Sequence, residues 1–177
     1  MAIRIIEGKI GSGKTYYAVH HVFRSWYKWS DETDEWIPKN SDIEIKVYTN
    51  IKKMKLGSDL NLAIEEAGGL NPFFTEEYQE RFSENCNAIY IIDEAQSYDL
   101  FHRSYKDKQV FTFFQKSRHI GIDIYLITQD VQSLAKELRS LAEYHIVAVQ
   151  RTKSIGNLFT YKFYAGKDCF KTKRIKK

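Results

Sequence analysis

The chain is poor in cysteine, and its histidines lack the spacing of a metal site. Two cysteines, Cys86 and Cys169, occur among 177 residues, and neither belongs to a C-x-x-C pair. The five histidines form no H-x-x-x-H or H-E-x-x-H arrangement. This spacing argues against a disulfide framework and against the common zinc motifs. We therefore expect reduced thiols in a cytosolic compartment and no metal centre built on imidazole.

Long apolar runs are also absent. The opening residues MAIRIIEG are too short in apolar side chains for a secretory signal, and no run approaches the roughly 18 residues of a membrane span. Charge is uneven, because residues 167–177 hold six Lys or Arg and one acid, which leaves 21 basic and 22 acidic residues in 1–166. This basic end is either a solvated, frayed terminus or a surface for anionic lipid or nucleic acid. Because such runs are absent we expect this chain to be soluble, and from its abrupt basic end we expect a fragment of a longer protein.

Apolar runs alternate with helical patterns, which predicts an α/β fold in one compact domain. Buried strands are expected at residues 3–6, 43–49, 88–92, 122–128 and 144–150. A helix that carries Tyr16, Trp26 and Trp29 is expected after the first strand. Further helices are expected at 60–67, 75–83, 105–117 and 130–142, with a polar stretch at 30–42. The pattern indicates a five-stranded, mostly parallel sheet with helices on both faces. The turn signal SIGN at 154–157 predicts an antiparallel edge hairpin, so we divide the chain into a core, 1–150, and a hairpin extension with a basic tail, 151–177.

Residues 8–15, GKIGSGKT, match G-x-x-x-x-G-K-[ST] in full between a predicted strand and a predicted helix. The glycines permit backbone angles that turn successive N–H groups toward one anion, and the helix N-terminus adds a favourable field. The predicted nucleotide-binding residues are Gly8, Gly11, Ser12, Gly13, Lys14, Thr15 and Tyr16. Lys14 would neutralise the β and γ phosphates, and Thr15 would hold Mg²⁺. The expected fold is therefore the three-layer sandwich of P-loop NTPases, unless the glycines form only a tight turn.

An acid pair, Asp93-Glu94, follows the buried run AIYII. Carboxylates at the end of a buried strand are unfavourable unless they meet positive charge. Asp93 beside Mg²⁺, directly or through water, meets this condition, and Glu94 can then activate water as a general base. The alternative is a pair that only caps a helix.

Two further polar groups are candidates for the same site. Gln129 directly follows the strand at 122–128 and is either a sensor of the γ phosphate or a cap of the next helix. An arginine from a neighbouring subunit can also stabilise phosphoryl transfer. Arg118 ranks above Arg139 and Arg151 because it closely precedes the sensor strand, although each is also a plausible surface arginine. The predicted catalytic residues are Lys14, Glu94, Gln129 and Arg118.

The segments GKIGSGKTYYAV, AIYIIDEAQ and KSRHIGIDIYLITQDVQSLAKELRSLA together resemble the zonular occludens toxin family, which includes the assembly ATPases of filamentous phages. The first two segments are general to P-loop ATPases, and the third narrows the resemblance, which covers residues 1–150. It implies an ATPase domain on the cytoplasmic face of the bacterial inner membrane, followed in the complete protein by a transmembrane helix and a periplasmic part. Family members are thought to act as oligomers that use ATP to assemble and extrude phage, and some have been proposed as toxins of epithelial junctions.

The leading hypothesis is an Mg²⁺-dependent ATPase motor for phage assembly, with ATP as ligand and coat or other assembly proteins as partners. A nucleotide-responsive scaffold with negligible turnover and a small-molecule kinase share the same phosphate cradle, and the resemblance adds a toxin-family effector. The chain lacks the N-K-x-D element of guanine-binding GTPases, which favours ATP. DNA contact stays open, because the near-neutral body offers no basic stripe.

Overall fold

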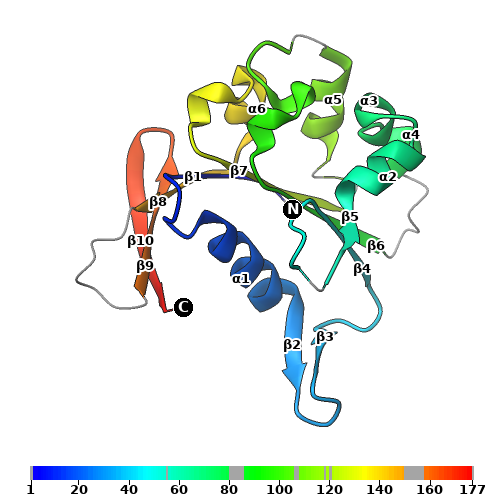
Figure 1. The fold of residues 1–177 in the computed structure, drawn as a ribbon, viewed down its shortest axis with the longest axis vertical. Coiled ribbons are helices and arrows are strands. Elements are labelled where there is room, and N and C mark those ends of the chain that lie inside the picture. The colour runs from blue at the N-terminus through cyan, green and yellow to red at the C-terminus, as the bar shows by residue number, and fades with distance from the viewer. Residues whose placement is uncertain are drawn as a thin grey trace.

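A computed structural model describes residues 2–54, 56–79, 86–105, 108–117, 119, 121–149 and 158–176. Within these residues the centre of the molecule is an eight-stranded sheet in the order β10-β9-β8-β1-β7-β6-β4-β5 (Figure 1). Six strands are parallel: β1 (Ile3–Glu7), β4 (Glu44–Thr49), β5 (Ser58–Asp59), β6 (Cys86–Ile92), β7 (Ile122–Thr128) and β8 (Tyr144–Val149). The antiparallel strands are β9 (Leu158–Ala165) and β10 (Asp168–Lys176). The predicted α/β sheet with an antiparallel edge is confirmed.

The strand count differs slightly from the prediction. All five predicted parallel strands are present, and β5 is a sixth. It could not be predicted, because it consists of two exposed polar residues and has no apolar pattern. The polar stretch also contributes to a separate two-stranded sheet, formed by β2 (Tyr27–Ser30) and β3 (Glu35–Pro38). The prediction that Trp29 lies on the first helix is wrong, because α1 ends at Trp26 and Trp29 lies in β2. There it faces Trp36, with ring centroids 5.7 Å apart. The aromatic pair, rather than a longer apolar run, stabilises this hairpin.

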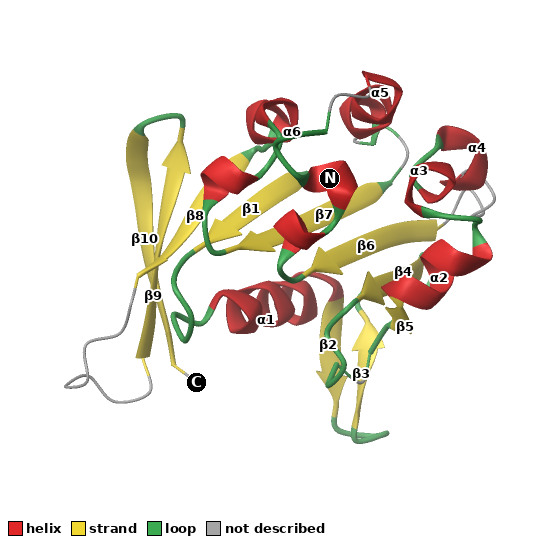
Figure 2. Ribbon diagram, turned by 45° about the horizontal axis from the view of Figure 1, so that its top comes forward, coloured by secondary structure: helices red, strands yellow, loops and turns green. Residues whose placement is uncertain are grey.

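Helices cover both faces of the sheet, as predicted (Figure 2). One face carries α1 (Lys14–Trp26). The other carries α2 (Leu60–Glu66), α3 (Leu70–Phe73), α4 (Glu76–Gln79), α5 (Lys108–Lys116) and α6 (Lys136–Leu141). Short 3₁₀ turns occur at Ala95–Ser97, Asp99–Phe101 and Val131–Ser133. No helix among the described residues has the length and apolar character needed to cross a membrane.

The prediction of one helix over 130–142 is wrong in its first half. Asp130 does act as an N-cap, since its carboxylate accepts from the N–H of Gln132 at 2.9 Å. The turn that it caps is only a 3₁₀ turn, because Leu134 is extended and Ala135 is not helical. Ala135 donates its N–H to the carbonyl oxygen of Phe101 at 2.9 Å, and this bond to a distant turn replaces a helical one.

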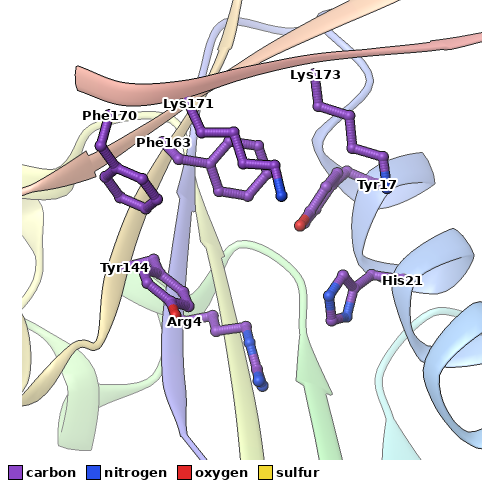
Figure 3. Close-up of a pocket in the computed structure, with 8 residues that line it drawn as sticks. All are labelled: Arg4, Tyr17, His21, Tyr144, Phe163, Phe170, Lys171 and Lys173. Carbon is purple, nitrogen blue, oxygen red and sulfur yellow. The ribbon is translucent and has the colours of Figure 1, made fainter.

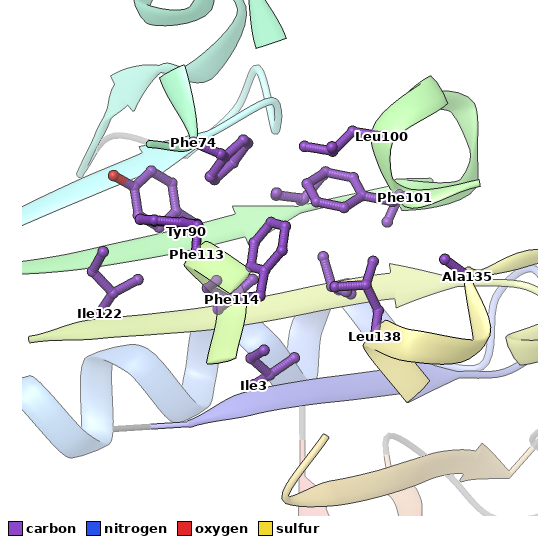
Figure 4. Close-up of a cluster of buried hydrophobic side chains, with 14 of the residues drawn as sticks. Ile3, Phe74, Tyr90, Leu100, Phe101, Phe113, Phe114, Ile122, Ala135 and Leu138 are labelled. Carbon is purple, nitrogen blue, oxygen red and sulfur yellow. The ribbon is translucent and has the colours of Figure 1, made fainter. Parts of the chain in front are cut away.

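Two apolar clusters fill the layers. One lies between the sheet and helices α2 to α6, where Phe74, Phe101, Phe113 and Phe114 meet (Figure 4). The other lies between the sheet and α1, and it combines side chains of the parallel strands with Phe159, Tyr161 and Phe163 of β9.

The basic C-terminal segment is a strand. β10 pairs antiparallel with β9, from Asp168 opposite Ala165 to Lys176 opposite Leu158, and it forms the edge of the sheet. The alternative of a frayed terminus therefore does not apply to these residues. The predicted turn at 154–157 and the division after residue 150 fall outside the described residues.

We predict that Phe114→Ala destabilises the protein by about 3–5 kcal/mol, because it removes a ring that is 1% exposed and leaves a cavity among three other rings. Urea unfolding followed by circular dichroism measures the change. Phe114→Leu, which keeps most of the volume, should show a smaller loss. Phe170→Ala is the matched control, since this ring is 53% exposed. Equal losses for Phe114→Ala and Phe170→Ala would contradict the assignment of the core.

Candidate nucleotide-binding site

The loop over residues 8–15 joins the carboxyl end of β1 to the first turn of α1. Gly11 and Gly13 have φ angles of 77° and 90°, which side chains other than glycine rarely adopt. A Cβ atom at Gly13 would lie 2.5 Å from the ring of Phe159, so β9 also requires a glycine there. At Gly11 a Cβ atom would meet nothing within 4 Å, and the loop is therefore open on that side.

Two polar side chains of the loop are buried and only weakly engaged. Ser12 is fully buried, and its hydroxyl has no hydrogen-bond partner among the described residues. Lys14 is 7% exposed, and its ammonium donates to the carbonyl oxygen of Lys9 at 3.3 Å. A buried hydroxyl without a partner is unfavourable unless a ligand pairs with it. These groups, with the open backbone of the loop, fit a phosphate.

Asp93 lies at the end of β6 and links the loop to two other segments. Its Oδ2 accepts from the hydroxyl of Thr15 at 2.8 Å, and its Oδ1 accepts from the N–H of Glu94 at 3.0 Å. The side-chain amide of Asn50, which follows β4, bonds to both the N–H and the carbonyl oxygen of Asp93, each at 2.8 Å. Adjacent hydroxyl and carboxylate oxygens are the ligands that Mg²⁺ prefers, so Thr15 and Asp93 fit that ion.

Glu94 has a left-handed backbone, with φ and ψ both 49°. This conformation is rare for a residue with a side chain, and the Ser97 N–H and hydroxyl stabilise it by donating to the Glu94 carbonyl at 2.9 and 2.8 Å. The side-chain amides of Gln96 and Gln129 donate to the two carboxylate oxygens. The Gln129 bond is 2.9 Å long and joins the end of β7 to the end of β6. The carboxylate is thus held from two sides.

The predicted residues fall into two hydrogen-bonded pairs, Thr15 with Asp93 and Glu94 with Gln129, and the N–H of Glu94 connects them. Tyr16 differs, because its hydroxyl donates to the carbonyl oxygen of Lys176 at 2.9 Å, so its side chain is used against β10. Any contact of Tyr16 with a nucleotide stays a prediction.

The arginine candidates are not settled by these contacts. Arg118 and Arg151 lie outside the described residues, and Arg139 donates to the side chain of Gln132. Ser117 and Gly121 lie just before the start of β7, whereas the loop follows the end of β1, its parallel neighbour.

Sequence reasoning missed three groups of the site. Asn50 could have been found, because it directly follows a predicted strand, as Asp93 and Gln129 do. Tyr161 and Phe159 could not, because their roles depend on the pairing of β9 with β8: the Tyr161 hydroxyl donates to the carbonyl oxygen of Gly13 at 2.9 Å, and Phe159 packs on the same glycine.

Glu7, the last residue of β1, is a further structural support of the loop. Its Oε1 accepts from the N–H of Val131 at 3.1 Å, and its Oε2 lies 2.9 Å from Nε2 of His145. The hydrogen bond with His145, and less strongly the Val131 N–H, hold the pKa of Glu7 below its ordinary value against the opposing effect of burial. Glu7 thus ties the start of the loop to the segments that follow β7 and begin β8.

A parallel sheet with this glycine loop, followed by a strand-end Asp-Glu pair, defines the P-loop NTPase class. The profile of the zonular occludens toxin family matches residues 2–176, and the chain belongs to that family. Curated relatives include the gene 1 proteins of Escherichia phage If1 and Enterobacteria phage M13. Each is 24% identical over 169 residues, covering 93% of this chain and 46% or 47% of the relative. The chain thus spans less than half the length of these relatives.

Two solved structures are similar in fold. The N-terminal domain of zonular occludens toxin from Neisseria meningitidis has a TM-score of 0.67 and 24% identity, covering 98% of this chain and 93% of that chain. The genome packaging NTPase B204 from Sulfolobus turreted icosahedral virus 2, solved with ATP-γ-S, has a TM-score of 0.56 and 18% identity, covering 91% of each chain. Both agree with the P-loop NTPase architecture.

We predict that acid weakens the fold partly through Glu7. A carboxyl group with a lowered pKa stabilises the folded state above its unfolded pKa, and this contribution is lost as the pH falls through the folded pKa. The free energy of unfolding should therefore fall as the pH drops from about 5 through the lowered pKa, and Glu7→Gln should flatten this dependence. Urea unfolding at a series of pH values measures it. Glu137→Gln, at an exposed position of α6, is the control, and an unchanged slope in Glu7→Gln would refute the role of Glu7.

Proposed function

We propose that the protein is an Mg²⁺-dependent ATPase that drives the assembly and extrusion of filamentous phage. The observation that carries the proposal is the continuous hydrogen-bonded path from Thr15 through Asp93 and Glu94 to Gln129. The path lies beside the carboxyl ends of three neighbouring strands, β1, β7 and β6, and this supports Thr15 and Asp93 as metal ligands, Glu94 as base and Gln129 as sensor. Ligands of open parallel sheets bind at such ends.

Each residue has a distinct role in this proposal. The N–H groups of the loop, with Ser12 and Lys14, bind the β and γ phosphates of ATP. Thr15 and Asp93 hold Mg²⁺, which when bound supplies positive charge against the phosphate oxygens. Glu94 accepts a proton from the attacking water, and the amides of Gln129 and Gln96 fix the direction of its carboxylate. Gln129 also senses the γ phosphate: it contacts this phosphate in ATP and loses the contact once the phosphate has left.

The partners follow from the relatives rather than from this site. The curated relatives are phage gene 1 proteins, and the family membership supports a role in phage assembly. We propose that the complete protein acts as a homo-oligomer on the cytoplasmic face of the bacterial inner membrane, anchored by a segment outside this chain. Coat or other assembly proteins are its proposed partners, and Arg118 is proposed to act on the site of a neighbouring subunit.

We predict that Lys14→Ala abolishes nucleotide binding. The variant removes a nearly buried ammonium that can pair with phosphate, so affinity for a fluorescent ATP analogue should fall at least about 100-fold. Lys9→Ala is the control, because only its main-chain oxygen contacts the Lys14 ammonium. Retention of full affinity by Lys14→Ala would exclude the loop as the phosphate site.

We predict that Glu94→Gln separates binding from turnover. The variant keeps the shape of the side chain but cannot accept the proton, so phosphate release should drop about 100-fold or more while ATP affinity stays within a few-fold. Phosphate release is measured on the oligomer with Mg²⁺, and Gln96→Ala tests the second contact that orients the Glu94 carboxylate. Parental turnover by Glu94→Gln would remove Glu94 from the mechanism. Negligible turnover by the parent oligomer would instead support a nucleotide-responsive scaffold.

A further inference from the structure

A cavity of about 180 Å³ lies between α1 and the β9–β10 hairpin (Figure 3). Arg4, Lys171 and Lys173 line it, together with the rings of Tyr144, Phe163 and Phe170. We call this cavity the basic pocket. Arg4 and Tyr144 are paired near the amino ends of β1 and β8. The basic pocket therefore lies toward the amino ends of these strands, whereas the nucleotide loop follows the carboxyl end of β1.

The basic pocket has no carboxylate among its lining residues. Arg4 is ion-paired with Asp123 at 3.1 Å, so the charge left without an acid partner is that of the two lysines. Lys171 and Lys173 form no ion pair with any described residue. Lys171 lies over the ring of Phe163, with its ammonium 5.6 Å from the centroid. Burial, with the charges of Arg4 and Lys173, lowers the pKa of His21 to about 4, and this residue is neutral at physiological pH.

The β2–β3 hairpin has the complementary character. Asp31, Glu32, Asp34 and Glu35 are all exposed at its tip, and none of them is ion-paired within the described chain. Behind the tip, Trp29 and Trp36 are 45% and 38% exposed. The hairpin extends away from the sheet, from the far end of α1 (Figures 1 and 2). We call residues 27–38 the acidic hairpin.

We propose that the acidic hairpin of one copy docks at the basic pocket of the next. Carboxylates at the tip would pair with Lys171 and Lys173, and an exposed tryptophan would contact the aromatic wall. A cavity of roughly 150 Å³ admits a benzene ring, so the basic pocket has room for part of one such side chain. Lysine and arginine also bind favourably over indole rings. The charges therefore select the partner, and the rings supply apolar contact.

This contact is head-to-tail, because the two surfaces are different parts of the chain. Figure 1 shows the acidic hairpin and the β9–β10 hairpin on opposite sides of α1, so the two surfaces are well separated in one copy. Head-to-tail contacts close into rings or continue as filaments. The inference deepens the oligomeric state proposed above and rests on that part of it alone, since it requires no nucleotide hydrolysis.

Charge reversal tests the proposal in the full chain. Asp31→Lys, Glu32→Lys and Glu35→Lys together reverse the charge of the acidic hairpin, leaving Asp34 as its one acid at the tip, and Lys171→Glu with Lys173→Glu reverses the two lysines of the basic pocket. Sedimentation at low salt should show self-association of the parent. For either variant alone the dissociation constant should be at least about tenfold larger. An equimolar mixture of the two variants should associate again, because each reversed surface then meets a complementary one.

A matched control uses two bases on the opposite face of the same strands. Lys162 lies between buried Tyr161 and Phe163 in β9, and Arg174 alternates with Lys173 in β10, so both face away from the basic pocket. Lys162→Glu with Arg174→Glu changes the net charge by the same amount and should leave the dissociation constant within about twofold. Circular dichroism and ATP-analogue binding verify that every variant is folded.

Four results would overturn the proposal. They are a parent that stays monomeric, a mixture that does not recover association, a control that weakens association as much as the reversal of the basic pocket, and capture of the pocket by nucleic acid. In the last case, a labelled oligothymidylate would bind the parent but not the Lys171→Glu, Lys173→Glu variant, and this variant would self-associate as strongly as the parent. Phosphate release is measured separately, so an inactive parent that still passes the mixing test would count against the proposed ATPase alone.

Discussion

The candidate site depends on the position of one carboxylate, that of Asp93. Its two oxygens accept from the Thr15 hydroxyl and the Glu94 N–H, while the amide of Asn50 fixes its main chain. These bonds fasten the ends of β4 and β6 to the first turn of α1. Because both carboxylate oxygens and both main-chain polar groups of Asp93 are hydrogen-bonded, this residue has little freedom to move. Its fixed position allows Glu94, whose backbone is strained, to present its side chain to Gln129.

The parallel sheet could be predicted because its strands are read from local signals. Buried parallel strands need apolar side chains on both faces, and β6 and β7 are buried at every position. The acidic hairpin could not be predicted in this way, since its strands are mostly exposed and are stabilised by one pair of indoles. The break before α6 was also unpredictable, because a hydrogen bond from Ala135 to distant Phe101 decides it.

The pairing of site residues was partly within reach of the sequence. Asp93 and Gln129 each follow a buried run, and the carboxyl ends of parallel strands meet at one edge, so their proximity follows from topology. Asn50 also follows a predicted strand directly. No sequence pattern indicates that the Tyr16 hydroxyl bonds to Lys176, because this contact depends on how the last strand folds back along α1. Local pattern identifies which groups can act, and long-range pairing decides how they are held.

The contacts of β9 with the glycine loop have a consequence for shortened forms of the chain. Phe159 packs against Gly13, and the Tyr161 hydroxyl donates to its carbonyl oxygen, although nearly 150 residues separate the partners. A polypeptide trimmed after β8 would keep every letter of the GKIGSGKT motif and lose both supports. An intact motif in a truncated product is therefore no guarantee of an intact phosphate cradle.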